Sequence, residues 1–509
     1  MPAPPPPGPR APALLQALRI GLDPVGYLSS LRDRYGPAFT VRYPGFAPEV
    51  YVTTAELAEK VYALDAGGGR AGEVRRAFLE PVVGPHSLLN LDGAPWMRHR
   101  KLLSPPLRGR AVSGYRGEIT RIAADAMDGW PTGEPVTLLD LMQQITLEVI
   151  MRLVFGIRDL RRRDRLRMLL PKLLRTGSAR LAALSPRLRD RMMRSSPLRR
   201  VPSLPTTRLA VLREAVDAIL YDEIARRRAE PDPDAEDVLS RLLAARDGEG
   251  RPMSDQEIRD ELLTMLEAGH ETTATALAWT FERLAREPRV LRTLRAELEA
   301  GEERYLDAVI KEALRARPVV YEAPRLLDAP LRLGGHEVPA GWSVAPLIAL
   351  VHRDPAVFPD PEEFRPERFL GEGAARAQKS WMPFGGGRRY CVGAQLALLE
   401  MRVIIREALA RFDPVAPDPA PEASRFTLVT LAPARRARLV LRPRAAAPVP
   451  AGRMIVVVRP GEPGGPRRAT EPAGSQSSSS SSHSLSASRQ ALLRSAAVCS
   501  ASAAASRVS

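Results

Sequence analysis

The sequence predicts a mainly α-helical protein with small β-sheets, an α+β fold in a single large domain. Most windows from Ala55 to about Pro288 show the apolar spacing of helices, and segments that alternate apolar and polar residues occur near either end of this helical mass. One proline-free helical pattern is long enough to cross a large domain. The chain has 509 residues, 44% of them hydrophobic, which is enough to bury a sizeable core.

Composition divides the chain into three parts. Residues 1–22 are a proline-rich N-terminal segment that begins MPAPPPPGPR, and residues 23–445 contain the helix and strand patterns. Residues 446–509 are rich in Pro, Gly and Ser and poor in large apolar residues, so we expect a disordered tail. The domain is therefore expected over residues 23–445.

Three segments predict β-hairpins. The first, AFTVRYPGFAPEVYVTT, alternates around a Pro-Gly turn, and the second, LRLGGHEVPAGWSVAPL, alternates around a Gly-Gly turn. The third, FTLVTLAPARRARLVLRP, is expected to turn around Pro433.

A long central helix is predicted to begin at a capping box. Ser254 and Glu257 form the S-x-x-E pattern, and the helical spacing then runs without proline as far as Pro288. At 1.5 Å per residue this helix is about 50 Å long.

The middle of this helix contains residues that do not favour a helix. A glycine and three threonines surround His270 and Glu271, and such local inconsistency often marks a functional site. A metalloprotease H-E-x-x-H motif is excluded because Ala274 stands where the second histidine is needed.

The charge of the chain does not indicate nucleic-acid binding. The net charge is +16, but only five of the basic residues are lysines, and no fingerprint of a nucleic-acid module accompanies them. Basic residues are dense over 158–200. We expect them to face solvent, and a membrane surface or an acidic partner are the alternatives.

Cysteine usage and hydropathy predict a cytoplasmic protein. Cys391 and Cys499 cannot form a disulfide framework, which favours a reducing compartment. No apolar run reaches the roughly 20 residues of a membrane span, and the N-terminus lacks the apolar region of a secretory signal. We expect no transmembrane anchor.

Cys391 is expected at the N-terminus of a helix. The unpaired N–H groups there favour a thiolate, so we expect the pKa of Cys391 to lie below the free value of about 8.5. A thiolate can bind a metal or attack carbon, and the glycines before it allow close approach to something flat and large. The predicted helix places five apolar residues near one face: Leu396, Leu399, Val403, Ile404 and Leu409.

The segment around Cys391 carries the pattern F-x-x-G-x-R-x-C-x-G, which resembles the haem-binding loop of the cytochrome P-450 family, in particular its soluble bacterial members. The resemblance implies that Cys391 is the proximal thiolate ligand of the iron of haem b. The pattern is filled by Phe384, Gly387, Arg389, Cys391 and Gly393.

The A-G-x-E-T-T segment of the long helix is similar to the oxygen-binding groove of the same family. The resemblance implies that Ala268 lies against the haem and that Glu271 and Thr272 deliver protons during oxygen activation. Taken alone, the segment also has a structural alternative, in which the threonines hydrogen-bond back to helix carbonyls.

Two further sets of residues follow the family's order along the chain. The resemblance joins Glu312 and Arg315 of E-x-x-R to Arg368 of P-E-R-F in a buried ion cluster that positions the cysteine loop. It also implies that the haem propionates are bound by Trp96, Arg100, Arg325 and Arg389. His99 and His352 are not expected as axial ligands, because the cysteine fills the fifth position and dioxygen needs the sixth.

The resemblance implies a haem-dependent monooxygenase that hydroxylates a small apolar substrate such as a fatty acid, terpenoid or steroid. Nothing in the chain resembles a flavin, nicotinamide or iron-sulfur domain, so electrons from NAD(P)H must arrive through a separate ferredoxin or flavodoxin with its reductase. Arg98, Lys101 and Arg388 would suit an acidic carrier. We expect a monomer.

Two alternatives remain open. A haem-thiolate peroxygenase or isomerase would turn over without a reductase, although the Glu271-Thr272 pair argues against it. A non-catalytic haem sensor or electron carrier would form no product from any substrate and would fill the sixth position with a protein side chain.

Overall fold

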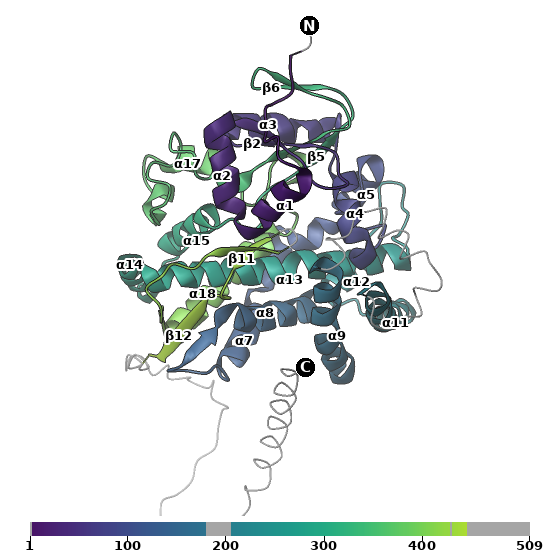
Figure 1. Ribbon diagram of the computed structural model, residues 1–509. Helices are drawn as coiled ribbons and strands as arrows, with labels where there is room; N and C mark the ends of the chain where they lie inside the picture. The colour runs from purple at the N-terminus through teal and green to yellow at the C-terminus, as the bar shows by residue number, and fades with distance from the viewer. Residues whose placement is uncertain (1–2, 180–204, 428–429, 445–509) are drawn as a thin grey trace, which may run out of the picture. The chain divides into compact units, whose positions relative to one another are not determined.

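A computed structural model describes residues 3–179, 205–427 and 430–444. Residues Met1–Ala447 form one compact unit, and helix α13 (Asp255–Arg286) runs through its middle (Figure 1). The predicted capping box is present, since the Ser254 hydroxyl accepts the Glu257 N–H while the Glu257 carboxylate accepts the Ser254 N–H. The predicted long central helix is therefore confirmed, and so is the mainly α-helical fold class.

Other helices surround α13. Its most extensive neighbour is α8, and α4, α15 and α18 also pack against it. These helices bury apolar faces in one large core around α13. Their bounds, with those of the remaining helices and short turns, are α1 (Ala13–Leu22), α2 (Pro24–Tyr35), α3 (Ala55–Ala63), η1 (Leu64–Ala66), α4 (Ala71–Val83), α5 (Gly93–Leu103), η2 (Pro105–Leu107), α6 (Gly109–Gly114), α7 (Arg116–Met127), α8 (Leu138–Val149), η3 (Ile150–Val154), α9 (Leu160–Ala179), α11 (Pro205–Ala229), α12 (Val238–Ala244), α14 (Pro288–Glu299), α15 (Arg304–Ala316), α16 (Ile348–Val351), η5 (Pro366–Phe369), α17 (Ala374–Ser380), η6 (Gly387–Arg389) and α18 (Ala394–Arg411).

The β structure forms four small sheets within the described residues. The largest has the order β1-β2-β8-β5-β3, in which only β2 and β8 are parallel, and the others are β6-β7, β10-β11 and β4-β12-β9. The strands are β1 (Ala38–Val41), β2 (Glu49–Val52), β3 (Gly69–Arg70), β4 (Pro135–Thr137), β5 (Arg325–Leu327), β6 (Leu331–Leu333), β7 (His336–Val338), β8 (Ser343–Pro346), β9 (Phe412–Val415), β10 (Ser424–Thr427), β11 (Thr430–Pro433) and β12 (Arg438–Pro443).

Two of the three predicted hairpins are confirmed, and the third is wrong in its turn. β1 pairs with β2, and β6 pairs with β7 across the Gly-Gly turn. Around Pro433 the chain instead changes sheet, because β11 pairs with β10 whereas β12 pairs with β4 and β9. Arg436 and Ala437 have φ of 60° and 51°, and this left-handed backbone redirects the chain.

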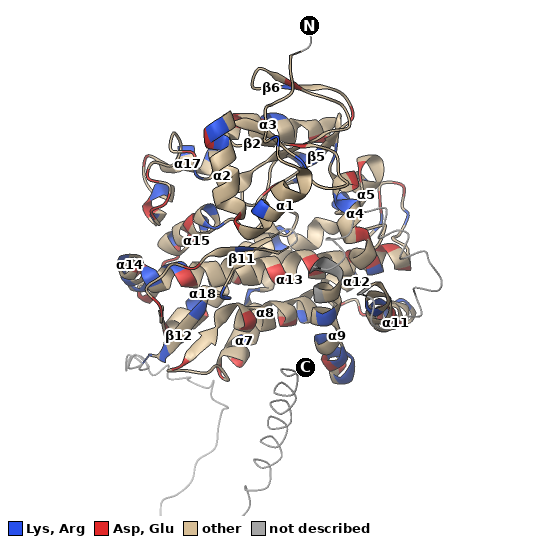
Figure 2. Cartoon of the chain, viewed as in Figure 1, with Lys and Arg blue, Asp and Glu red and all other residues tan. Residues whose placement is uncertain are grey.

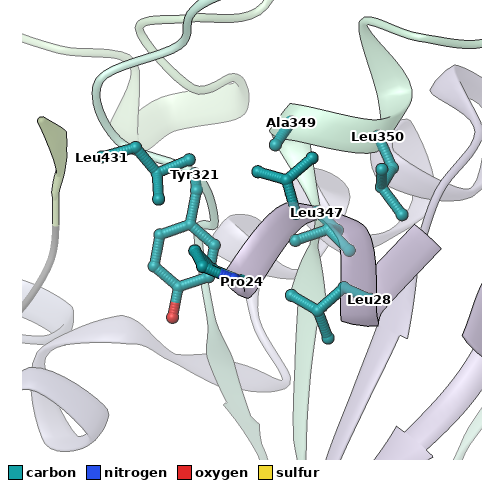
Figure 3. A pocket seen from close by; sticks show the side chains of 8 residues that line it. Pro24, Leu28, Tyr321, Leu347, Ala349, Leu350 and Leu431 are labelled. Carbon is teal, nitrogen blue, oxygen red and sulfur yellow. The ribbon is translucent and has the colours of Figure 1, made fainter. Parts of the chain in front are cut away.

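The proline-rich segment packs against the first sheet. The Thr40 hydroxyl and N–H donate to the carbonyls of Pro6 and Pro7 at 2.6 and 2.8 Å. Helix α2 packs against apolar side chains from distant parts of the chain (Figure 3). The space between these side chains is too small for a water molecule. This contact therefore serves packing. It includes Pro24, Leu28, Tyr321, Leu347, Ala349, Leu350 and Leu431.

Part of the arginine-dense segment lies on α9, where Figure 2 shows basic residues along the helix. Arg162 pairs with Glu223 of α11 at 3.1 Å, and Arg167 pairs with Glu148 of α8 at 2.5 Å. These arginines thus join neighbouring helices, a role that was not predicted from the sequence. Residues 180–204 and the predicted tail lie outside the described residues, and no helix within the described part is long and apolar enough to cross a membrane.

Candidate functional site

The cysteine loop lies between α17 and α18 and folds tightly on itself. The Cys391 N–H donates to the Phe384 carbonyl at 3.0 Å, and Gly385 and Gly387 have φ of 72° and 63°. A Cβ on Gly387 would lie 2.7 Å from the Tyr62 carbonyl oxygen, so this glycine allows the loop to pack on α3 and η1. No atom lies within 4 Å of a Cβ built on Gly393, the glycine two residues after the cysteine.

Cys391 lies three residues before α18. Its sulfur accepts hydrogen bonds from the backbone N–H groups of Gly393 and Ala394, and the Arg100 guanidinium lies nearby. Burial nevertheless raises the pKa of the thiol above its usual value, and these donors only reduce the shift. The expectation of a lowered pKa was wrong because desolvation outweighs the effect of the helix N-terminus. Cys391 nevertheless remains exposed at the surface of the described structure.

The predicted oxygen-binding stretch is the one part of the middle of α13 that is open. Ala268 is exposed and Gly269 and Thr272 are half-buried, whereas most residues on either side are buried. The Thr272 hydroxyl donates to the Ala268 carbonyl at 2.5 Å, so the back-bonding left open by the sequence is present. Its side chain still lies at the open stretch. Burial raises the pKa of Glu271, an effect that Arg436 partly opposes.

His270, between these residues, is turned into the core. Its Nδ1 lies 2.9 Å from the Thr146 hydroxyl of α8, and burial lowers its pKa to about 4. It is therefore a neutral packing residue that ties α13 to α8.

Glu312, Arg315 and Arg368 come together in a cluster with almost no exposure. Arg315 donates to both Glu312 oxygens at 2.7 and 2.9 Å, and Arg368 Nε lies 3.4 Å from Glu312 Oε1. Glu312 also accepts the Arg365 N–H at 2.8 Å, while Arg315 reaches the His352 carbonyl at 3.0 Å. The cluster thus links α15 to the segments that precede the cysteine loop.

The four residues expected at the propionates lie near one another, and two of them already have carboxylate partners. Arg325 binds Asp65 through two hydrogen bonds of 2.7 and 3.2 Å, and Arg389 binds Asp92 at 2.5 Å. The Arg389 guanidinium carbon lies 4.6 Å from the centre of the Trp96 ring. The remaining arginine, Arg100, donates to the Tyr390 carbonyl at 2.6 Å.

Arg75 of α4 belongs to the same site and was not predicted from the sequence. Within the described residues, its guanidinium has no hydrogen-bond or ion-pair partner, and burial together with Arg325 and Arg389 lowers its pKa to about 9. Asp65 and Asp92 offset its charge only in part, because these two carboxylates are bound by Arg325 and Arg389. No motif in the sequence marks Arg75, and its place follows only from the packing of α4 against β5.

These charges fit a haem. Four guanidinium groups surround two carboxylates, so two positive charges are unbalanced, and a haem carries two propionates. The Trp96 indole N–H also has no acceptor in the described structure. With the open Cys391 sulfur as a donor for iron, the residues suit the group: Arg75, Trp96, Arg100, Arg325 and Arg389 at the propionates and Cys391 at the metal.

Neither histidine considered as an axial ligand is free. His99 lies between Glu261 and Glu257, with its ring nitrogens 2.7 and 3.1 Å from their oxygens. His352 accepts the Met382 N–H at 2.9 Å, and burial lowers its pKa to about 3. Both side chains serve the packing of the domain.

Comparison with known proteins agrees with this geometry. Residues 2–439 match the family model described as Cytochrome P450. The chain is 40% identical over 446 residues to the putative cytochrome P450 135B1 of Mycobacterium tuberculosis, covering 86% of this chain and 91% of that protein, and 37% identical to putative cytochrome P450 135A1 of the same organism, covering 86% and 95%.

Solved structures give the same result. Retinoic acid bound cyanobacterial CYP120A1 superposes with a TM-score of 0.74 at 25% identity, over 87% of this chain and all of that chain. The haem domain of cytochrome P450DA gives 0.73 at 24% identity, over 88% and 98%, which supports the fold.

The fold and site define a haem-thiolate protein. The chain belongs to the cytochrome P450 family, whose members are haem-thiolate monooxygenases. Its cofactor is haem b, and its electrons come from NAD(P)H through partner proteins.

Proposed function

We propose that the protein hydroxylates an apolar organic substrate with dioxygen and electrons from a separate ferredoxin or flavodoxin and its reductase, as a monomer in the cytoplasm. The observation that carries the proposal is Cys391, which is exposed and whose sulfur accepts two backbone N–H groups. When bound, the haem supplies the activation of dioxygen. The cyanobacterial CYP120A1 was solved with retinoic acid bound, and this ligand is a largely apolar hydrocarbon with one carboxyl group, which supports the proposed substrate class.

Thr272 and Glu271 are proposed to supply protons. The Thr272 hydroxyl can give up its bond to the Ala268 carbonyl and donate into the open stretch, and Glu271 is a carboxyl group one residue away. The raised pKa of Glu271 makes it a better proton donor near neutral pH than an exposed glutamate.

The electron carrier is proposed to bind on the cysteine side. Lys101, Arg108 and Arg388 are exposed there, whereas Arg98 is less available than expected because it pairs with Asp247 at 2.6 Å and Glu257 at 2.7 Å. An acidic carrier would be attracted to this surface. The rate of reduction should fall as ionic strength rises, and no dependence on salt would count against this surface.

The decisive experiment is the difference spectrum of the dithionite-reduced protein with carbon monoxide. The wild type should show the spectrum of a thiolate-ligated haem, Cys391→Ser should lose it, and Cys499→Ser should keep it. A nitrogen-ligated spectrum in the wild type would overturn the proposal. Turnover with a reductase and dioxygen separates the monooxygenase from a peroxygenase or isomerase, and product formation separates it from a sensor or electron carrier.

A further inference from the structure

Glu267 is a second acidic residue in the middle of α13, one helical turn before Glu271. Residues four apart lie on the same side of a helix, with Cβ atoms about 6 Å apart. Both side chains are half-buried, and neither has a hydrogen-bond or ion-pair partner in the part of the chain that the structure describes.

This lack of partners is unusual for α13. The other carboxyl groups on its inner turns are bound by arginines, a histidine or backbone N–H groups, so they are compensated in place. They are Asp260 with His86 N–H and Arg259, Glu261 with Leu88 N–H and His99, and Glu282 with Arg283 and Arg286. Glu267 and Glu271 thus stand out as carboxyl groups that no structural contact requires.

An unpartnered carboxyl group in such a place is stable when it is neutral or when it faces water or a reacting group. Burial, followed by the charge of Glu271, raises the pKa of Glu267 to about 7. Arg436 lowers the pKa of Glu271 and is not among the groups that shift the pKa of Glu267. The proton of the pair is therefore held preferentially by Glu267, and Glu271 ionises first.

The charged groups around the pair are few. From the turn between β11 and β12 comes Arg436, which is itself bound to Asp140 and Gln143 of α8. His270, between the two glutamates in sequence, points to Thr146 and is neutral. Near neutral pH the proton on Glu267 therefore has one adjacent carboxylate to move to, that of Glu271.

We propose that Glu267 is a proton-relay residue that reloads Glu271. The O–H bond of the Glu267 carboxyl breaks as an O–H bond forms on the Glu271 carboxylate, directly or through one water molecule, and Glu267 then takes a proton from solvent. Glu271 in turn serves Thr272. The relay rests on the proposed monooxygenase function, in which two protons and two carrier-supplied electrons reduce one atom of dioxygen to water. Glu267 acts through Glu271 and is a positioning residue.

The first test does not depend on activity. Infrared difference spectroscopy of the holoprotein, titrated across neutral pH, should show the carbonyl band of a protonated carboxyl group that shifts in heavy water. Glu267→Gln should remove this band, and Glu287→Gln should not. Glu287 is a matched control because it caps the C-terminal end of the same helix and burial also raises its pKa. If Glu267→Gln keeps this carboxyl band, the proposal is overturned.

The second test is turnover. Glu267→Gln should form several-fold less product per NAD(P)H consumed, with a larger solvent isotope effect. The wild type should lose activity as pH rises through about 7, and Glu267→Gln should lack this decline. Glu267→Asp should restore part of the coupling, and turnover with hydrogen peroxide, which brings its own protons, should be unchanged. Unchanged coupling and pH profile in Glu267→Gln would overturn the relay.

The outcomes separate this inference from the proposed function. A wild type without a thiolate spectrum or without reductase-supported turnover overturns the function. A wild type with both, but with a Glu267→Gln variant that behaves as wild type, overturns the relay alone. If Glu267→Gln fails to fold, the proposal is tested with Glu267→Asp and with the infrared titration of the wild type. A wild type without any protonated carboxyl band that titrates near neutral pH contradicts the proposal.

Discussion

Removal of Glu312 should cost more stability than any single surface substitution. Its side chain and that of Arg315 have no exposure, and it accepts two hydrogen bonds from Arg315 and one from the Arg365 N–H. Glu312→Ala leaves the Arg315 charge buried without a carboxylate, and breaking such a pair costs about 3–5 kcal/mol. A typical domain is stable by about 5–15 kcal/mol, so a large part of the free energy of unfolding would be lost.

The measurement is urea unfolding of the holoprotein, followed by circular dichroism and by haem absorbance. We expect a lower midpoint for both signals in Glu312→Ala and earlier haem loss, because the cluster holds the segment before the cysteine loop. Glu56→Gln is the control, since it breaks the exposed pair of Glu56 with Lys60 and should leave the midpoint unchanged. If the two variants unfold at the same urea concentration, the cluster does not hold the domain together.

Four further outcomes are expected. Gly387→Ala should weaken haem retention, because the added Cβ meets the Tyr62 carbonyl at 2.7 Å and φ is 63°; equal retention in haem-transfer assays would contradict this packing. Arg75→Leu should weaken haem affinity about tenfold or more, from the loss of one charged hydrogen bond of about 1.5–3 kcal/mol, and Arg75→Lys should recover part of it. Thr272→Ala should lower product per NAD(P)H while peroxide-driven turnover persists. The pKa of His270 is about 4 in the folded protein and about 6.5 in the unfolded chain, so the unfolded chain binds the proton first as pH falls. The free energy of unfolding should therefore fall by on the order of 3 kcal/mol between about pH 6.5 and pH 4. His270→Gln should flatten this pH dependence.

The features that the sequence predicted well are local ones. The capping box and the unbroken apolar spacing define α13, and Pro-Gly and Gly-Gly turns define two hairpins. The third hairpin failed because Pro433 ends a strand without reversing the chain. The antiparallel pair that forms here is β10 with β11, and the side chains of Thr427 and Thr430 at its end hydrogen-bond to each other. Threonine predicts a chain reversal less strongly than glycine does.

The counter-charges of the site could not be predicted, because they come from distant positions. Asp65 lies 260 residues before its partner Arg325, and Asp92 lies 297 residues before Arg389. The motif arginines could therefore be recognised without their carboxylates. The pairing of Arg98 with Asp247 and Glu257 could not be predicted for the same reason. These ion pairs make Arg98 a structural residue more than a docking residue.

The arginine-rich composition acquires a structural meaning from these pairs. Arg315 binds one carboxylate and two backbone carbonyls, and Arg325 does the same with Asp65 and the carbonyls of Ala323 and Pro324. A lysine has three donors at one point and cannot span such partners, whereas the planar guanidinium has five donors in fixed directions. Arginine is thus the basic residue that can hold buried loops together, and at the proposed haem site the same chemistry leaves two cations for the propionates.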